Sequence, residues 1–460
     1  MVHRWFVFWL IVYKHLFIRF FQLVGLRWLF WKIAHSNEPY ERINGPIFLR
    51  RVFEDLGPTY IKLGQLIASS PGLFPEAYAK EFQKCLDRVP PISTETAKSI
   101  IAQGLGKPYT EIFATFEDEP IAAASIAQVH GATLADGSDV VVKIQRPQIH
   151  DRVVADVAIM RRAASIGQRF SKQLQLSNAV GIIDDFHRTI LEELDFRKEG
   201  RNMDEFNEIV HTHGMAELVA PKVYWDYTGE LVLTMERFHG FKADDVEKIR
   251  EFGIDSEKYL RTGLRGWMLT VMLYGFFHGD VHAGNLMFLP DTKRIGFLDF
   301  GIIGRFTDEQ RMQVLKYILL FVTQDWEGLA HQMVEMGSAP KDVPIKEFAA
   351  GMAKTYEPLM SKSLADIKYQ EVLPNITRYA LKYGVRIPNE FILILKQLLY
   401  FDRYAKLTAP KLNVFSDLYL VDFLFTPEAM KRGMDMNQIM PILQRIQQLQ
   451  AQQSAAASAG

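Results

Sequence analysis

Two short polar motifs, separated by a predicted β-hairpin, constrain this chain more than any other feature of its sequence. The first is the run Phe277–Asn285, which contains Asp280, and the second is the run Phe297–Gly301, which contains Asp299. Apolar stretches at 286–288 and 295–298 predict the two strands of the hairpin. Phosphoryl transfer needs a carboxylate near the acceptor and oxygen ligands that hold Mg²⁺ on the phosphates. The two motifs together supply both.

The order and spacing of these residues are typical of a protein-kinase catalytic loop followed by its metal-binding segment. Asp280 is expected to be the catalytic carboxylate, and Asn285 and Asp299 are expected to be the metal ligands. Either motif alone is weak, whereas the combination is specific. The alternative is a structural loop in which His and Asp side chains cap helices.

An upstream lysine fits the same chemistry. Lys143 lies in the strand-like run 140–144. The lysine that binds nucleotide phosphates in kinases likewise lies on a strand, although a strand lysine can also be merely solvated. Kinases place a glycine-rich loop before this lysine. The residues at its three glycine positions are alanines here: Ala122, Ala124 and Ala127. Because alanine disfavours positive φ, the loop is expected to be stiffer and to approach phosphates less closely. The hinge expected to receive adenine consists of Met235, Glu236 and Phe238.

Lys143 also needs a carboxylate that orients it. Glu193 is the predicted partner and the second choice is Glu199, both in the charged segment 191–202. This segment follows Lys143 at a larger distance than in ordinary protein kinases, so residues 150–185 are expected to be an inserted helical element. The alternative for the segment is a solvated, charged helix.

These motifs resemble the UbiB family, also called ABC1 or ADCK, of atypical kinases linked to ubiquinone and other isoprenoid-quinone lipids. The likeness includes a KxGQ motif within Gly57–Gln65 and extends over roughly residues 38–310. It implies an α+β, two-lobed, protein-kinase-like fold with a helical KxGQ extension packed across the nucleotide cleft. It also implies lid or regulatory roles for three residues of the KxGQ and ExD motifs: Lys62, Gln65 and Asp195. In two respects the chain departs from the family: Ala283 stands where proline is usual, and the C-terminal end lacks a membrane-spanning hairpin.

The first 35 residues are basic and aromatic, with no acidic residue before Glu38. At about 100° per residue, six polar residues share one helical face: Arg4, Lys14, His15, Arg19, Gln22 and Lys32. Opposite a face of Trp, Phe and Leu, this pattern predicts an interfacial helix whose cations meet anionic headgroups. Two alternatives remain. One is a spanning or re-entrant segment, against which the interrupting charges argue, and the other is a helix packed on the chain's own core.

The remaining patterns divide the chain into five regions. The predicted regions are a membrane-associating segment at 1–37, a helical KxGQ extension at 38–118, a kinase-like N-lobe with a helical insertion at 119–240, a helical C-lobe at 241–438, and a flexible tail at 439–460. The formal net charge of −1 provides no basic field for nucleic acid, which is not expected as a partner. The single cysteine, Cys85, fits a reducing compartment.

Soon after Gly301, Thr307 and Gln310 predict a capping box that opens a helix. This leaves no long activation segment on which a peptide substrate could bind, which argues against a general protein kinase. We expect a membrane-associated, Mg²⁺-dependent ATPase or atypical kinase that uses ATP or ADP in isoprenoid-quinone (ubiquinone-type) biosynthesis or its regulation. The alternatives are a small-molecule or lipid phosphotransferase and a nucleotide-gated pseudokinase scaffold.

The expected partners follow from the same reading. They are membrane lipids, quinone-precursor lipids and quinone-biosynthesis enzymes. The expected location is the cytoplasmic face of a bacterial inner membrane or the equivalent organelle membrane.

Overall fold

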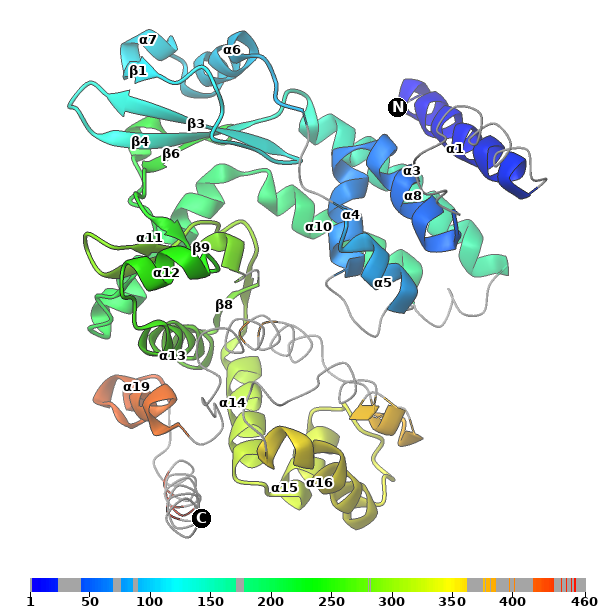
Figure 1. The fold of residues 1–460 in the computed structure, drawn as a ribbon. Coiled ribbons are helices and arrows are strands. Elements are labelled where there is room, and N and C mark those ends of the chain that lie inside the picture. The colour runs from blue at the N-terminus through cyan, green and yellow to red at the C-terminus, as the bar shows by residue number, and fades with distance from the viewer. Residues whose placement is uncertain are drawn as a thin grey trace. The chain divides into compact units, whose positions relative to one another are not determined.

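A computed structural model describes residues 2–23, 43–68, 76–85, 90–170, 178–279, 281, 283–361 and 417–433. Between 375 and 451 it also describes 375–376, 378–380, 382–385, 397, 401, 440, 444, 448 and 451. The chain forms two compact units (Figure 1): the first contains Met1–Gly200 and Lys222–Arg237, and the second contains Arg201–Pro221 and Phe238–Gly460. Most of the predicted tail at 439–460 lies outside the described residues.

The first unit contains an antiparallel sheet. Its strands are β1 (Phe113–Phe116), β2 (Ala122–Ala123), β3 (Ala127–Leu134), β4 (Asp139–Gln145) and β6 (Val232–Glu236), in the order β1-β3-β4-β6 with β2 paired to β3. The strand expected at 140–144 is confirmed as β4. Gly137, with φ of 87°, makes the turn between β3 and β4, as the Asp-Gly pair indicates.

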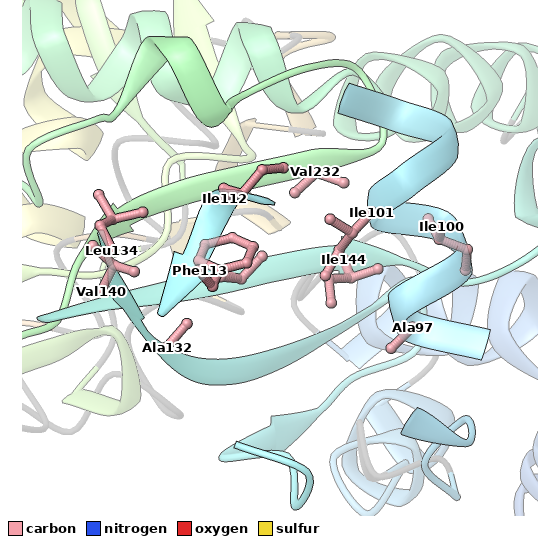
Figure 2. Packing of buried hydrophobic residues seen from close by; sticks show 11 residues of the cluster. Ala97, Ile100, Ile101, Ile112, Phe113, Ala132, Leu134, Val140, Ile144 and Val232 are labelled. Atoms are coloured by element: carbon pink, nitrogen blue, oxygen red, sulfur yellow. The ribbon is translucent and has the colours of Figure 1, made fainter. Parts of the chain in front are cut away.

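Helix α6 (Thr94–Leu105) covers one face of this sheet, and α7 (Tyr109–Ile112) leads into β1. Ser93 caps α6 by accepting a hydrogen bond from the Thr96 amide. Figure 2 shows the core of this sheet and its helices. The residues that α6, α7 and the sheet contribute to it are Ala97, Ile100, Ile101, Ile112, Phe113, Ala132, Leu134, Val140, Val142, Ile144 and Val232. Alternate residues of a strand point to opposite faces, so a core at Val140, Val142 and Ile144 leaves Lys143 on the other face of β4.

The other described elements of the first unit are mainly helices. It contains α3 (Gly45–Leu56), α4 (Pro58–Ala68), α5 (Glu76–Phe82), α8 (Ile149–Phe170), α10 (Ala179–Glu193) and the start of α11 (Phe196–Thr212). The predicted helical insertion at 150–185 is therefore confirmed as α8 and α10. The KxGQ glycine has a packing role, because a Cβ on Gly64 would lie 2.7 Å from the Phe82 ring and 3.2 Å from the sulfur of Cys85. Glycine lets α4 approach α5 this closely.

Helix α1 (Val2–Leu23) turns the opposite face inward from the one that the sequence analysis predicted. Its polar face, expected to meet lipid headgroups, packs on the first unit. Arg4 bonds to the buried carboxylate of Asp156 and to the Leu56 carbonyl, and Lys14 and His15 bond to Asp55 at 2.7 and 2.9 Å. Asp156 is fully buried, so its charge depends on cations such as Arg4.

Gln22 completes this inward face by bonding both backbone groups of Ile43, at 2.9 and 3.0 Å. The apolar face of α1 points outward instead. Among the described residues, no helix combines the length and the apolar composition needed to cross a bilayer. Of the other residues on the predicted polar face, Arg19 lies over the Phe48 ring, 5.2 Å from its centroid, and Lys32 lies outside the described residues.

The second unit contains a four-stranded sheet of order β5-β10-β9-β7 and a separate pair of strands, β8 and β11. The strands are β5 (Leu218–Val219), β7 (Phe241–Lys242), β8 (Phe276–His278), β9 (Leu286–Leu289), β10 (Arg294–Phe297) and β11 (Ile303–Arg305). The predicted hairpin is confirmed, with Arg294 paired to Leu289 and Phe297 paired to Leu286. Strands β5 and β7 had no recognised sequence signal, because each is only two residues long.

The helices of the second unit are α12 (Val246–Glu251), α13 (Ser256–Tyr274), α14 (Asp308–Val322), α15 (Trp326–Glu335), α16 (Ile345–Ser361) and α19 (Pro427–Lys431), with the 3₁₀ turns η4 (Leu418–Leu420) and η5 (Asp422–Phe425). Arginines of α13 fix the segment 417–433. Arg261 bonds to Asp417 at 2.6 and 2.8 Å, and Arg265 bonds to Asp422 at 3.0 Å.

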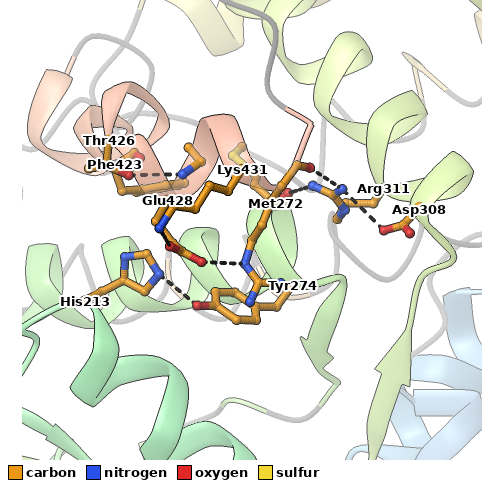
Figure 3. Close-up of polar contacts among 11 residues, drawn as sticks. His213, Met272, Tyr274, Asp308, Arg311, Phe423, Thr426, Glu428 and Lys431 are labelled. Carbon is orange, nitrogen blue, oxygen red and sulfur yellow. Dashed lines mark hydrogen bonds and ion pairs between the residues drawn. The ribbon is translucent and has the colours of Figure 1, made fainter.

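A polar cluster holds α19 in place (Figure 3). Arg311 donates to the carbonyls of Met272 and Arg432 at 3.2 and 2.8 Å, while the guanidinium of Arg432 lies 3.7 Å from the Tyr274 ring centroid. The Tyr274 hydroxyl and His213 Nε2 are 3.0 Å apart. The segment 417–433 is thus joined to α13 and α14 of the second unit.

Candidate nucleotide-binding site

Lys143 is held by a carboxylate, but by the second choice of the two. Its Nζ lies 2.8 and 2.9 Å from the two carboxylate oxygens of Glu199, in the first turn of α11, and 5.4 Å from the Phe196 ring centroid. Both side chains are largely buried, at 14% and 3% exposed. The prediction that Glu193 pairs with Lys143 is wrong. A buried, bidentate contact of this kind fixes the position of the lysine and its charge.

Glu193 binds Lys62 of the KxGQ motif instead. The Lys62 ammonium on α4 bonds to the Glu193 carboxylate at the end of α10. Gln65 lies three residues further along α4, on the same face of the helix as Lys62, and is half-buried. The KxGQ helix and the ExD motif are therefore joined directly by a lysine–glutamate pair within the first unit.

Asp195, the last residue of the ExD motif, lies directly before α11. Its carboxylate accepts hydrogen bonds from the backbone amide and the guanidinium of Arg197, at 3.1 and 2.8 Å. The hydrogen bond that the Arg197 guanidinium donates to Asp195 raises the pKa of Arg197. Because an acidic side chain at this position also complements the positive end of a helix, Asp195 supports the segment that carries Glu199.

The alanine loop is a tight hairpin. Ala122 and Ala123 of β2 pair with Val129 and Gln128 of β3, and the Ala124 amide bonds to the Ala127 carbonyl at 2.8 Å. Arg146, three residues after Lys143, donates to the Ala124 carbonyl at 2.9 Å and to the Pro90 carbonyl at 3.0 Å. These bonds fit the expected stiffness of a loop without glycine.

Two buried polar residues after this loop were not assigned a role from the sequence. Gln128 bonds both backbone groups of Ile92, at 2.9 and 3.3 Å, and its Nε2 lies 2.8 Å from His130 Nε2. His130 Nδ1 lies 2.8 Å from the Glu117 carbonyl, so Nδ1 carries the proton and Nε2 accepts from the glutamine amide. This network fastens β3 to the segments before α6 and after β1.

The predicted hinge residues lie at the end of β6. Met235 and Glu236 pair with Val141 and Val140 of β4, and the Glu236 carboxylate accepts from the Lys222 amide at 3.2 Å. Phe238 belongs to the second unit, where its ring occupies the space that a Cβ on Gly296 would need, at 2.5 Å.

The predicted metal ligands are close neighbours in the second unit. The Leu298 amide donates to the Asn285 carbonyl at 2.9 Å, so the residue before Asp299 is bonded to Asn285. Asp299 Oδ1 accepts from the Gly301 amide at 2.9 Å, which fixes the turn through the Asp-Phe-Gly sequence. Asp280 lies outside the described residues.

The Asp-Phe-Gly segment is anchored by its surroundings. The fully buried Phe300 packs on the rings of Phe206 and His278, with centroids 5.2 and 4.9 Å apart, and the Asn202 amide of α11 donates to the Phe300 carbonyl at 3.0 Å. Arg305 donates hydrogen bonds to Glu205 and to Asn202, and the bond to Glu205 raises the pKa of Arg305. The sequence analysis gave no role to Asn202 or Arg305, because neither belongs to the quoted motifs.

A third missed residue contacts the predicted catalytic loop. The side-chain oxygen of Gln397 accepts from the amide of Val281, the residue that directly follows Asp280, at 3.1 Å. Gln397 is fully buried, and its Nε2 has no hydrogen-bond partner among the described residues. It comes from more than 100 positions further along the chain, so no local pattern could have indicated it.

The stretch after Gly301 is short, as predicted. Strand β11 pairs with β8, bringing Ile303 opposite His278, and α14 then begins with the expected capping box of Thr307 and Gln310. Five residues separate Gly301 from the N-cap of the next helix.

The residues present fit a magnesium ion bound together with phosphates. Mg²⁺ takes oxygen ligands, and protein sites for it often use one or two carboxylates completed by phosphate oxygens and water. Asn285 and Asp299 provide such oxygens on adjacent segments. Among the described residues, no group of three His, Cys, Asp or Glu side chains forms a metal site.

The fold and these motifs define an atypical, kinase-like α+β protein. The family model of the ABC1 atypical kinase-like domain matches residues 84–333, and that of the UbiB helical domain matches residues 352–413. The chain belongs to the ABC1/UbiB family of atypical kinase-like proteins. The helical domain, which contains Gln397, was not recognised in the sequence analysis.

Relatives match over most of the chain. An uncharacterized chloroplastic aarF domain-containing protein kinase of Arabidopsis thaliana is 38% identical over 397 residues, covering 81% of this chain and 73% of the relative. An uncharacterized protein of Mycobacterium tuberculosis is 41% identical over 384 residues, covering 82% and 77%. A Pseudomonas aeruginosa protein named "Probable protein kinase UbiB" is 31% identical over 371 residues, covering 80% and 69%.

A solved structure has the same fold. It is a Mycobacterium tuberculosis protein in complex with erythromycin, 23% identical, with a TM-score of 0.50 over 78% of this chain and 90% of that one.

Proposed function

We propose that this protein is a Mg²⁺-dependent, ATP-binding ATPase or atypical kinase that acts at a membrane in isoprenoid-quinone lipid biosynthesis or its regulation. The observation that supports this best is the buried pair of Lys143 and Glu199, 2.8 Å apart. A lysine and glutamate in this arrangement, on a strand and a following helix, is the phosphate-binding device of kinases. A merely solvated strand lysine would not be enclosed in this way.

In the proposed mechanism, Lys143 binds the α- and β-phosphates of ATP and Glu199 keeps its ammonium oriented. Asn285 and Asp299 would hold Mg²⁺, which neutralises charge on the β- and γ-phosphates when bound. Asp280 accepts a proton from water or from an acceptor hydroxyl while the new bond to the γ-phosphorus forms and the bond to the ADP oxygen breaks. Met235, Glu236 and Phe238 receive the adenine.

A small or lipid hydroxyl is favoured over a peptide as the acceptor, if one is used besides water. Protein kinases bind peptides on the long segment that follows Asp-Phe-Gly. Here α14 starts at Asp308, soon after β11. The proposed substrates are accordingly quinone-precursor lipids. The role proposed for ATP is either phosphoryl transfer to them or hydrolysis that drives their presentation to quinone-biosynthesis enzymes.

The test is ATPase activity of the full chain, measured with and without vesicles and quinone-precursor mimics. Asp299→Asn should reduce activity by about a hundredfold or more, because it removes a metal-binding charge. A parallel assay with γ-labelled ATP asks whether label appears in the lipid extract. An absence of magnesium-dependent nucleotide affinity in wild-type protein would contradict the proposal.

A further inference from the structure

The outward face of α1 is an exposed apolar surface. Seven side chains, each between 46% and 67% exposed, make up this face: Phe6, Trp9, Leu10, Tyr13, Leu16, Phe17 and Phe20. At about 100° per residue they occupy an arc of about 120°. Scattered apolar residues on a surface are ordinary, whereas a continuous stripe along a helix of 22 residues marks an interaction site.

The end of α8 borders this stripe. The guanidinium carbon of Arg162 lies 6.0 Å from the ring centroid of Trp5, at the edge of the α1 face. Arg169, Ile166 and Phe170 follow on the same side of α8, and all three are exposed, Phe170 at 87%. The cations beside the apolar face of α1 therefore come from α8.

The cations of α1 itself are used inside the first unit. Arg4 is bonded to Asp156, and both Lys14 and His15 are bonded to Asp55. Although burial acts in the opposite direction, the hydrogen bonds from Lys14 and His15 lower the pKa of Asp55, which keeps this carboxylate charged. Of the basic residues that the sequence assigned to lipid headgroups, Arg4, Lys14 and His15 thus already have carboxylate partners, and the guanidinium of Arg19 lies over the Phe48 ring, 5.2 Å from its centroid.

We propose that the α1 face and the end of α8 form a docking surface for an anionic lipid bilayer, with α1 lying in the membrane interface and Arg162 and Arg169 meeting the headgroups. The chemistry favours lipid over a protein partner. Tryptophan, tyrosine and phenylalanine together are typical of a membrane interface, the flanking charge is positive, and α1 contains no acidic residue. The surface is also the outer side of a helix and not a groove, and such a face can lie in the interface of a bilayer.

This inference rests on the proposed function only in placing the activity at a membrane, and it specifies which residues make the contact. It differs from the sequence-based expectation in a measurable way. Insertion comes from α1, whereas the attraction to anionic headgroups comes from α8.

The experiment is co-sedimentation of the full chain with vesicles of phosphatidylcholine alone and of phosphatidylcholine with phosphatidylglycerol. Wild type should bind the anionic vesicles more tightly, and salt should reduce that preference. The double variant Arg162→Gln/Arg169→Gln should lose about fivefold in anionic-vesicle affinity for each arginine. The triple variant Phe6→Ser/Phe17→Ser/Phe20→Ser should lose binding to both kinds of vesicle.

Two matched controls use cations outside the proposed surface. Arg161→Gln removes the same charge from α8, but Arg161 faces away and bonds to Asp184 at 2.7 Å. Lys14→Gln removes a cation of α1 that bonds to Asp55. Both variants should bind vesicles like wild type. The proposal is overturned if Arg161→Gln matches the double variant or if the triple variant still binds.

Two further measurements keep the outcomes separate. All substituted residues are exposed, so thermal unfolding should show that the variants are folded. A wild-type dimer that the triple variant converts to a monomer, with no vesicle binding in either, would assign the surface to a second copy and overturn the proposal. Asp299→Asn should bind vesicles normally, so loss of ATPase activity and loss of docking remain distinguishable.

Discussion

At the scale of single residues, the pairing of Lys143 shows where sequence reasoning stopped. Lys143 itself, its strand and the glutamate-rich segment were predictable from alternation and from motif spacing. The choice of partner was not, because the segment 191–202 was treated as one helix. In the structure α10 ends at Glu193 and α11 begins at Phe196. The break places the two glutamates on different helices, so each meets a different lysine.

Single substitutions of Glu193 and Glu199 should distinguish the roles of the two glutamates. Glu199→Gln should lower kcat/KM for ATP by about tenfold to a hundredfold, because the lysine that contacts the phosphates loses its orientation. Glu193→Gln should leave the ion pair of Lys143 and Glu199 intact, and with it the affinity for ATP. Any change in ATPase activity should then come from the release of Lys62. Steady-state ATPase assays and calorimetric nucleotide titration check this. Equal losses of nucleotide affinity in both variants would contradict the assignment.

At the scale of elements, the hairpin, the capping box and the helical insertion followed from periodicity and turn chemistry. The contact between the predicted catalytic loop and the UbiB helical domain could not be predicted from such local patterns, because Gln397 and Val281 are distant in sequence. Their bond explains how a loop that lacks the usual proline, with Ala283 in its place, is held. Tertiary contacts of this kind leave no local pattern.

Gln397 is accordingly expected to be a positioning residue. Gln397→Met retains the side-chain volume but removes the acceptor of the Val281 amide, which leaves a buried donor unpaired at a cost of about 1–3 kcal/mol. We expect kcat to fall while KM for ATP changes little, since Asp280 is adjacent to Val281. Gln332→Met, at a buried glutamine of α15, is the matched control. A rise in KM with unchanged kcat would argue against this role.

At the scale of the whole molecule, the α+β kinase-like class was predictable and the boundaries of the compact units were not. Residues 201–221 belong to the second unit although β6 follows them in the first. The chain thus crosses between units three times, which a linear reading of domains cannot represent. The predicted orientation of α1 was also wrong, because helical periodicity identifies two faces without saying which one is buried.

Global stability should depend on pH through His213. Burial, together with the cations Arg432 and Arg265, lowers the pKa of His213 from its ordinary 6.5, against the effect of Glu428. The unfolded chain then binds a proton more readily than the folded protein, so stability is lost as pH falls from above 6.5 toward the lowered value. The apparent unfolding midpoint should decrease between about pH 7.5 and pH 5.5.

His213→Gln should flatten this part of the profile, because it removes the group that titrates. His331→Gln, at an exposed histidine of α15, serves as the control and should reproduce the wild-type slope. Thermal melts at a series of pH values measure both. A wild-type slope in His213→Gln would show that another group is responsible.

The inward-facing arginine of α1 has a practical consequence for anyone who wishes to shorten this protein. Deleting the first helix to obtain a fragment free of lipids would also take Arg4 from Asp156, a carboxylate with no exposed surface. Its remaining ion-pair neighbour among the described residues would be Arg152, at 3.9 Å. The helix is therefore a structural part of the KxGQ region, and its outer side chains should be edited individually while the peptide is left in place.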